Sequence, residues 1–187
     1  MNQTNQESVD RYPASLRVLH WARAILILGL LWAGWYMTGL DDEVPSKYEL
    51  YYPWHKSFGL LAFLVVLVQL TIRLRTPRLP EPPQTLARYE QVLSKLVHRA
   101  TYALLVSVPL MGYSMSSTFT MSDGVFFFGV NLPELLPKDD DWFAVFTWLH
   151  KVLAYTLLGL IVLHVVGAIK HRLFDQDPRS DVLHRML

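Results

Sequence analysis

The sequence predicts an all-α integral membrane protein, a four-helix bundle with both termini in the cytoplasm. Three observations lead to this prediction. Of the 187 residues, 52% are hydrophobic and only 18% are charged, which is too few polar groups to cover a soluble globule. Four stretches contain no Asp, Glu, Lys or Arg. The basic residues are distributed very unevenly over the segments between these stretches.

The uncharged stretches set the expected helices. Each is close to the roughly 20 residues that a helix needs to cross a bilayer. A β-barrel would show short alternating segments instead. We therefore expect one domain over residues 1–187, with transmembrane helices at approximately 14–40, 54–75, 96–119 and 142–171.

The first stretch is interpreted as a retained helix rather than a signal peptide. It is long, carries Trp32, Trp35 and Tyr36, and has no small-residue cleavage site before Asp41. Four prolines between Thr76 and Gln84 forbid a continued helix and predict an extended linker after the second span. In the third span, a proline and a glycine predict a kink.

Charge distribution predicts the orientation. With four crossings, the termini and the linker lie on one side, and 13 of the 17 basic residues fall there. By the positive-inside rule that side is the cytoplasm, which predicts a multi-pass membrane protein with both termini inside. The opposite side has nine acidic residues and a net charge of −5; its four basic residues are Lys47, Lys56, Lys138 and Lys151.

Four of the seven histidines fall at two matching depths. His150 and His164 are fourteen residues apart on the fourth span, so they face nearly the same way near opposite membrane surfaces. His55 opens the second span at the outer surface, and His20 precedes the first uncharged stretch at the inner surface. The expected pairs are therefore His55 with His150 and His20 with His164, each contributed by two helices.

Such pairs point to haem. Imidazole inside a bilayer is costly, and two imidazoles facing each other across a bundle suit a haem iron bound on both sides. The absence of cysteine excludes iron–sulfur clusters and thiolate haem ligation. The alternative is that these are ordinary buried or interfacial histidines. With both axial positions filled, two stacked haems would be suited to electron transfer rather than to chemistry at the metal.

Two arginines flank the inner pair. Arg17 and Arg23 lie three residues on either side of His20, where they could bind haem propionates, or they could simply obey the positive-inside rule. His98 starts the third span without a free partner at its depth. It is expected to be interfacial or to bond a propionate.

These features resemble the bacterial cytochrome b561 family of four-helix, two-haem membrane proteins, and the resemblance covers nearly the whole chain. Taken singly each motif is weak, but their order and spacing are specific. The matching segments are Leu19-His20-Trp21, Trp54-His55-Lys56-Ser57-Phe58-Gly59 leading to Arg73, His98 with Tyr102, Phe128-Gly129, the His150/His164 spacing, and Lys170-His171-Arg172-Leu173-Phe174-Asp175.

The resemblance implies two b-type haems held by His20, His55, His150 and His164, with ubiquinone near the cytoplasmic face. For the quinone we nominate Arg73, Arg75 and His171, since a quinone gaining electrons needs a cation and a proton source. The alternative is that the arginines contact lipid headgroups and that the histidine is solvated.

The function expected from the resemblance is electron transfer between a periplasmic donor and the quinone pool of the respiratory chain. Alternatives are a superoxide:ubiquinone oxidoreductase, as in one branch of the family, and a cytochrome subunit that anchors a larger redox enzyme. The outer charge of −5 would slow anionic superoxide, although Lys56 and Lys151 directly follow the two outer histidines. A channel is less compatible with two porphyrins filling the bundle, and no nucleic-acid partner is expected.

Overall fold

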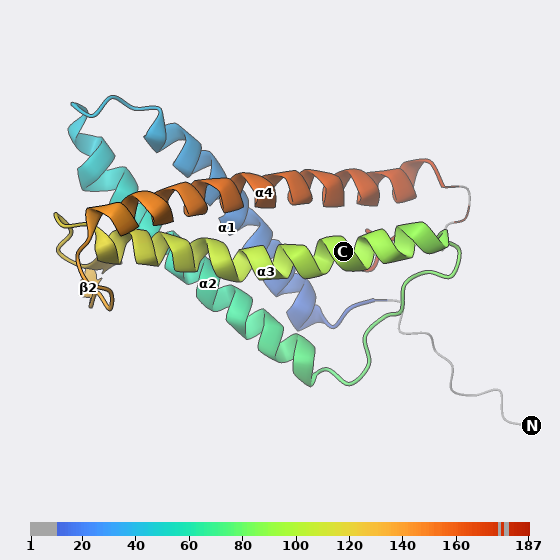
Figure 1. Ribbon diagram of the computed structural model, residues 1–187. Helices are drawn as coiled ribbons and strands as arrows, with labels where there is room; N and C mark the ends of the chain where they lie inside the picture. The colour runs from blue at the N-terminus through green and yellow to red at the C-terminus, as the bar shows by residue number, and fades with distance from the viewer. Residues whose placement is uncertain (1–10, 176, 178–179) are drawn as a thin grey trace, which may run out of the picture.

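The computed structural model describes residues 11–175, 177 and 180–187. It consists of four long helices and one small hairpin. Figure 1 shows α3 and α4 lying side by side, with α1 and α2 forming a second pair that crosses behind them. The elements are α1 (Ala14–Thr38), the π-helix η1 (Lys47–Tyr51), α2 (Tyr52–Arg75), α3 (Arg88–Thr118), β1 (Val125–Phe127), β2 (Val130–Leu132) and α4 (Asp140–Leu173).

Three helical segments are long and apolar enough to cross a membrane. They are Ala14–Thr38, Lys47–Arg75 and Asp140–Leu173. At 31 residues α3 is also long enough, but its first turns carry several charges and its last residues are Ser116, Ser117 and Thr118. The chain is therefore a multi-pass helical membrane protein, and the crossing by α3 stays a prediction.

Two helices begin earlier than the sequence predicts. The second starts as η1 at Lys47 rather than near residue 54, with a widened turn ahead of Pro53, which has no N–H to donate. The third starts at Arg88 rather than near residue 96. Its first turn is capped because the Ala87 N–H donates to the Glu90 carboxylate at 3.1 Å, and Lys170 of α4 pairs with the same carboxylate at 2.6 Å.

The core is small and lies between the helix pairs. Val66, Leu105 and Leu157 form its centre, and Ile27 and Tyr102 pack against it. Many other large apolar side chains are exposed, which suits a lipid environment. The Pro-rich linker between α2 and α3 has no helix or strand, as its prolines predict.

Candidate functional site

Side chains that recur every seven residues divide the bundle into layers. Seven residues make about two helical turns, so such residues share a face and lie about 10 Å apart along the axis. The acidic-end layer, nearest the hairpin, consists of Gly34, His55, Gly112 and His150. The middle layer consists of Ile27, Ala62, Leu105 and Leu157. The basic-end layer consists of His20, Gln69, His98 and His164.

The structure brings the four predicted histidines together as two pairs. The rings of His55 and His150 have centroids 6.3 Å apart and are inclined by 82°. The rings of His20 and His164 are also 6.3 Å apart, inclined by 60°. An imidazole nitrogen binds a metal at about 2 Å, so two such bonds plus about 1 Å from each nitrogen to its ring centre give about 6 Å. The spacing of both pairs therefore fits one iron between two rings.

The helices that carry each pair do not pack closely through their backbones. Among the described residues, the close backbone packing is between α1 and α2, α2 and α3, and α3 and α4. The histidine pairs instead join α1 to α4 and α2 to α4, whose backbones have at most marginal contact. The paired histidine rings thus approach each other between helices whose backbones are not closely packed, which is the arrangement that a porphyrin between the helices requires.

Two glycines make space beside the acidic-end pair. A Cβ atom on Gly112 would lie 3.1 Å from both Cε1 and Nδ1 of the His150 ring. A Cβ atom on Gly34 would lie 3.4 Å from Cε1 of His55. Gly112 is therefore required for the present position of the His150 ring, and Gly34 adjoins the partner ring.

Hydrogen bonding orients one ligand candidate for metal binding. Nδ1 of His150 lies 2.9 Å from the Val108 carbonyl oxygen, which can only accept, so Nδ1 carries the proton. Its Nε2 is then free to bind a metal, and such an outer hydrogen bond is the usual support of a ligating histidine. Nδ1 of His55 is buried without a hydrogen-bond partner.

The basic-end pair adjoins a cluster of cations. Arg23 lies 3.2 Å from Nδ1 of His20 through Nη2, and its other terminal nitrogen, Nη1, is buried without a partner. Arg23 and Arg73 both approach the Tyr102 ring, at 5.1 and 5.8 Å from its centroid. In the described part of the chain neither arginine forms an ion pair with a carboxylate. The cluster therefore has unused capacity for an anion, which a haem propionate fits.

Arg17 is engaged differently from the expectation. Its Nη1 donates to the backbone carbonyl oxygen of Leu187, while its Nε is buried without a partner. The neighbouring Trp21 indole donates to the Met186 carbonyl oxygen at 2.8 Å. The last residues of the chain thus cover the start of α1, a contact that no sequence signal predicted.

His98 has a neighbour that the sequence reasoning missed. Its ring lies 5.0 Å from the His164 ring and is inclined to it by 72°. Because His164 is already paired with His20, the expectation that His98 lacks a free partner at its depth is not contradicted, and its interfacial or propionate-bonding role stays a prediction. Ser94 lies 3.3 Å from its Nδ1. The spacing of fourteen residues between His98 and Gly112, equal to that between His150 and His164, is the signal that could have placed it.

His171 lies beyond the basic-end layer and is not part of either pair. Its Nδ1 lies 2.7 Å from Asp175, four residues later, and Lys170 pairs with the same carboxylate at 3.1 Å. These hydrogen bonds, first from His171 and then from Lys170, hold the pKa of Asp175 below its ordinary value. Asp175 therefore stays ionised at neutral pH and fixes the orientation of the His171 ring.

The hairpin docks on α2 beside His55. Ser57 is fully buried, and its hydroxyl accepts a hydrogen bond from the Phe128 N–H at 3.1 Å and lies 3.2 Å from the Phe126 carbonyl oxygen. The Phe128 ring packs against Trp54 and Phe58, with centroids 5.8 and 5.3 Å away. The hairpin thus lies over the acidic-end layer.

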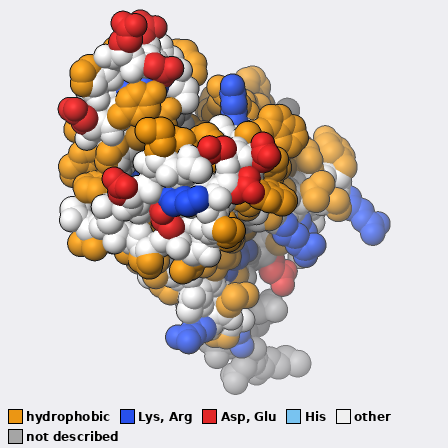
Figure 2. Space-filling view, turned by 60° about the vertical axis from the view of Figure 1, so that its left-hand side comes forward, with side chains coloured by type: hydrophobic (Ala, Val, Ile, Leu, Met, Phe, Trp, Pro, Cys, Tyr) orange, Lys and Arg blue, Asp and Glu red, His pale blue; other side chains and the backbone are white. Residues whose placement is uncertain are grey.

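Acidic side chains dominate the end that carries the hairpin. Figure 2 shows them gathered there around a few lysines, as the charge count predicts. Lys47 is buried and pairs with Asp42 at 2.6 Å, so it adds little positive field. Hydrogen bonds from Lys47, and then from Tyr48, keep the pKa of Asp42 below its usual range.

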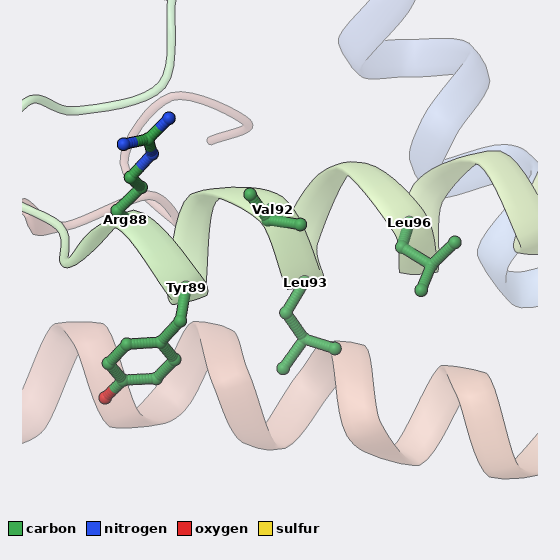
Figure 3. A pocket seen from close by; sticks show the side chains of 5 residues that line it. All are labelled: Arg88, Tyr89, Val92, Leu93 and Leu96. Atoms are coloured by element: carbon green, nitrogen blue, oxygen red, sulfur yellow. The ribbon is translucent and has the colours of Figure 1, made fainter.

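The shallow depression at the start of α3 does not coincide with either histidine pair. It is lined by Arg88, Tyr89, Val92, Leu93 and Leu96, all from one helix (Figure 3). Four of the five are apolar or aromatic, and Arg88 lies at the end of the row, which is typical of a lipid-facing surface near a headgroup region.

The fold and the site define a class: a multi-pass helical membrane protein with two paired-imidazole sites. The sequence profile of the prokaryotic cytochrome b561 family matches residues 11–187. The chain belongs to this family, and it is therefore a membrane cytochrome for which the family implies haem b binding and electron transfer. It is 29% identical over 184 residues to cytochrome b561 homolog 2 of Escherichia coli K12. The aligned region covers 95% of this chain and 92% of the relative.

Proposed function

We propose that this cytochrome transfers electrons across the bacterial inner membrane, between a periplasmic donor and the quinone pool, through two b-type haems. The observation that carries the proposal is the equal spacing of the two histidine pairs, 6.3 Å in each case, in two layers of the bundle. A mononuclear zinc site would instead want three or four ligands, and no group of three metal-binding side chains occurs in the described ranges.

The four histidines have defined roles in this proposal. His55 and His150 hold the acidic-end haem, and His20 and His164 hold the basic-end haem. A haem bound in this way accepts and releases single electrons, and two imidazole ligands leave no open position for a small molecule. Arg23 and Arg17 neutralise propionates, supported by their buried, unpartnered nitrogen atoms Nη1 and Nε.

The acidic end faces the periplasm in this proposal, α3 makes the fourth crossing, and both ends of the chain lie in the cytoplasm. Support comes from the 13 basic residues on the side of the linker and the ends. An acidic end attracts a basic donor protein and repels an anionic one, so electron donation should weaken as salt is added.

Ubiquinone is the proposed partner at the basic end, close to Arg73 and His171. Arg73 offers a cation without an ion-pair partner among the described residues, and it lies over Tyr102 at the same level as the Arg23 cluster. His171 can supply a proton, and its contact with Asp175 keeps the ring in one orientation.

Superoxide:ubiquinone oxidoreductase activity is the second candidate. It is favoured by Lys56, half-buried directly after His55, and by Lys151 directly after His150. The net charge of −5 at this end works against an anionic substrate. If superoxide reduces the purified protein with a rate constant near the diffusion limit, this activity is supported. If the rate constant is no greater than that of free haem, this activity is excluded.

The test of the main proposal is a reduced-minus-oxidised spectrum with haem quantitation on the purified full chain. We expect two low-spin b haems per chain. His55→Leu and His150→Leu should each leave one haem, with the same residual spectrum and midpoint potential. His20→Leu and His164→Leu should leave the complementary haem, and His184→Leu, on the surface beside Arg11, should keep both.

Two outcomes would contradict the assignment. One is a wild-type chain with fewer than two haems after production with ample haem supply. The other is a different grouping of the four variants. For the quinone site, Arg73→Leu and His171→Leu should keep both haems while slowing electron exchange with added ubiquinone; unchanged exchange in both would refute these two roles.

A further inference from the structure

Gln69 is a buried polar residue in an apolar helix. Its side chain is only 3% exposed, and Oε1 is buried without a hydrogen-bond partner. A buried polar atom without a hydrogen-bond partner destabilises the folded protein. Leucine at this position would avoid that cost, so the amide indicates a partner that the protein chain itself does not provide.

Neighbouring contacts place Gln69 at the basic-end site. Val66, three residues earlier, belongs to the core cluster against which Tyr102 packs. Arg73, four residues later, lies over the Tyr102 ring. Residues three and four apart share one face of a helix, so Gln69 faces the same region as Val66 and Arg73. The same tyrosine ring is also approached by Arg23, which contacts His20.

The two histidine layers differ at the positions that do not pair. In the acidic-end layer these positions are Gly34 and Gly112, which offer only space. In the basic-end layer they are Gln69 and His98, which offer hydrogen-bonding groups. The two sites therefore use equivalent helix faces. Of these unpaired positions, only those at the basic end carry polar side chains.

We propose that Gln69 is a positioning residue of the basic-end site, whose amide contacts the group held between His20 and His164 and sets its reduction potential. This inference rests on the proposed function. The oxygen is the negative end of the amide dipole, and it either faces the iron or accepts an N–H from an axial imidazole. Both contacts favour the oxidised iron and so lower the midpoint potential.

The experiment is a spectroscopic redox titration of the purified holoprotein. Gln69→Leu keeps the side-chain size and removes both polar atoms. We expect it to retain two haems and to raise the midpoint potential of the basic-end haem, which is the component that His20→Leu removes, while the other potential stays unchanged. Thr71→Val is the matched control, because its hydroxyl bonds the Leu67 carbonyl oxygen on the exposed side of α2.

The outcomes separate the inference from the proposed function. A rise in midpoint potential confined to the basic-end haem supports the inference, and a fall overturns it. If the leucine variant loses the basic-end haem alone, the potential of that haem in Gln69→Asn decides by the same criteria. An unchanged potential, or equal shifts of both haems, overturns it. If the leucine variant binds no haem at all, the same criteria apply to Gln69→Asn, which keeps the amide but shortens its reach. A wild-type protein without two haems would instead refute the proposed function.

Discussion

At the scale of single residues, the ring of His150 is fixed from two directions. Its Nδ1 bonds the Val108 carbonyl oxygen at 2.9 Å, and its edge lies against the open backbone of Gly112. Both contacts come from α3, while the ring belongs to α4. A proton on Nδ1 and a fixed plane are what a ligating imidazole needs from its surroundings.

We expect Gly112→Ala to weaken haem binding at the acidic end. The new methyl group would lie 3.1 Å from the ring, which can move away only by straining the bond to Val108. Loss of one hydrogen bond costs about 1 kcal/mol, or roughly a fivefold loss of affinity. Haem quantitation and redox titration measure the effect. Gly159→Ala on α4 is the control, because its new Cβ would contact nothing within 4 Å; equal behaviour of the two variants would contradict the prediction.

At the residue level, depth along the helices predicted which histidine rings lie near one another, while their role as ligands stays a prediction. The spacing along α4 and the positions of His20 and His55 give two pairs, and the structure has the same two pairs. Gln69 was missed because the reasoning considered only histidines and charged residues, and the contact between His98 and His164 was missed because each histidine was matched with a single partner. The contact of Arg17 with the end of the chain could not be predicted, since it depends on how a segment far away in sequence folds back.

At the scale of elements, the β-hairpin is attached to α2 by one buried hydroxyl. Its turn carries strain at Phe128, which has a φ of 47°, while Gly129 adopts its φ of 96° without steric cost. The bonds to Ser57 and the packing of the Phe128 ring offset that strain. A short hairpin in water is marginal by itself, so docking on the helix keeps it in place.

Ser57→Ala should release the hairpin without unfolding the bundle. The Phe128 N–H would lose its acceptor, at a cost of about 1 kcal/mol or more, which corresponds to about fivefold or more faster local opening. Hydrogen exchange of the amides in residues 125–132 measures this opening. Ser107→Ala is the control, since that hydroxyl bonds the Ala103 carbonyl oxygen within its own helix. Equal exchange rates in the two variants would show that Ser57 does not hold the hairpin.

Helix boundaries followed the uncharged stretches only in part. An uncharged stretch shows which residues can lie in the lipid, whereas the ends of a helix are set by its backbone hydrogen bonds. The first turns of α3 lie outside the uncharged stretch and are stabilised by Glu90 and its partner Lys170, a contact between helices. The π-helix before α2 and the two three-residue strands are too short to give a periodic signal.

At the scale of the whole molecule, the two ends carry opposite charge. Acidic residues gather on the end with the hairpin (Figure 2). In the sequence, all the arginines fall in the segments on the side of the linker and of the last residues of α4. The loops and the linker are short, which is the situation in which positive charge decides orientation. Both the proposed direction of the donor and the proposed quinone side depend on this orientation.

Cysteine labelling can test the orientation directly, because the natural chain has no cysteine. We introduce Asp123→Cys in the loop before the hairpin and Arg78→Cys in the Pro-rich linker, each in a separate variant. In intact spheroplasts a membrane-impermeant maleimide should label the first and not the second, and permeabilisation should expose both. The reverse pattern would show that the orientation is opposite to the proposed one. Labelling of both variants without permeabilisation would show that α3 does not cross the membrane.

The middle layer closes the space between the two histidine pairs with aliphatic side chains, of which Ala62, Leu105 and Leu157 are almost fully buried. Electrons tunnel through such a barrier, whereas ions and protons do not cross it. An electron moving from the acidic to the basic end would carry uncompensated negative charge toward the negative interior of an energised cell. The membrane voltage opposes that movement by about 2.3 kcal/mol per full charge for every 100 mV. In the proposed orientation, inward flow should therefore slow as the voltage rises and quicken when it collapses, and the rate would then report the energy state of the membrane.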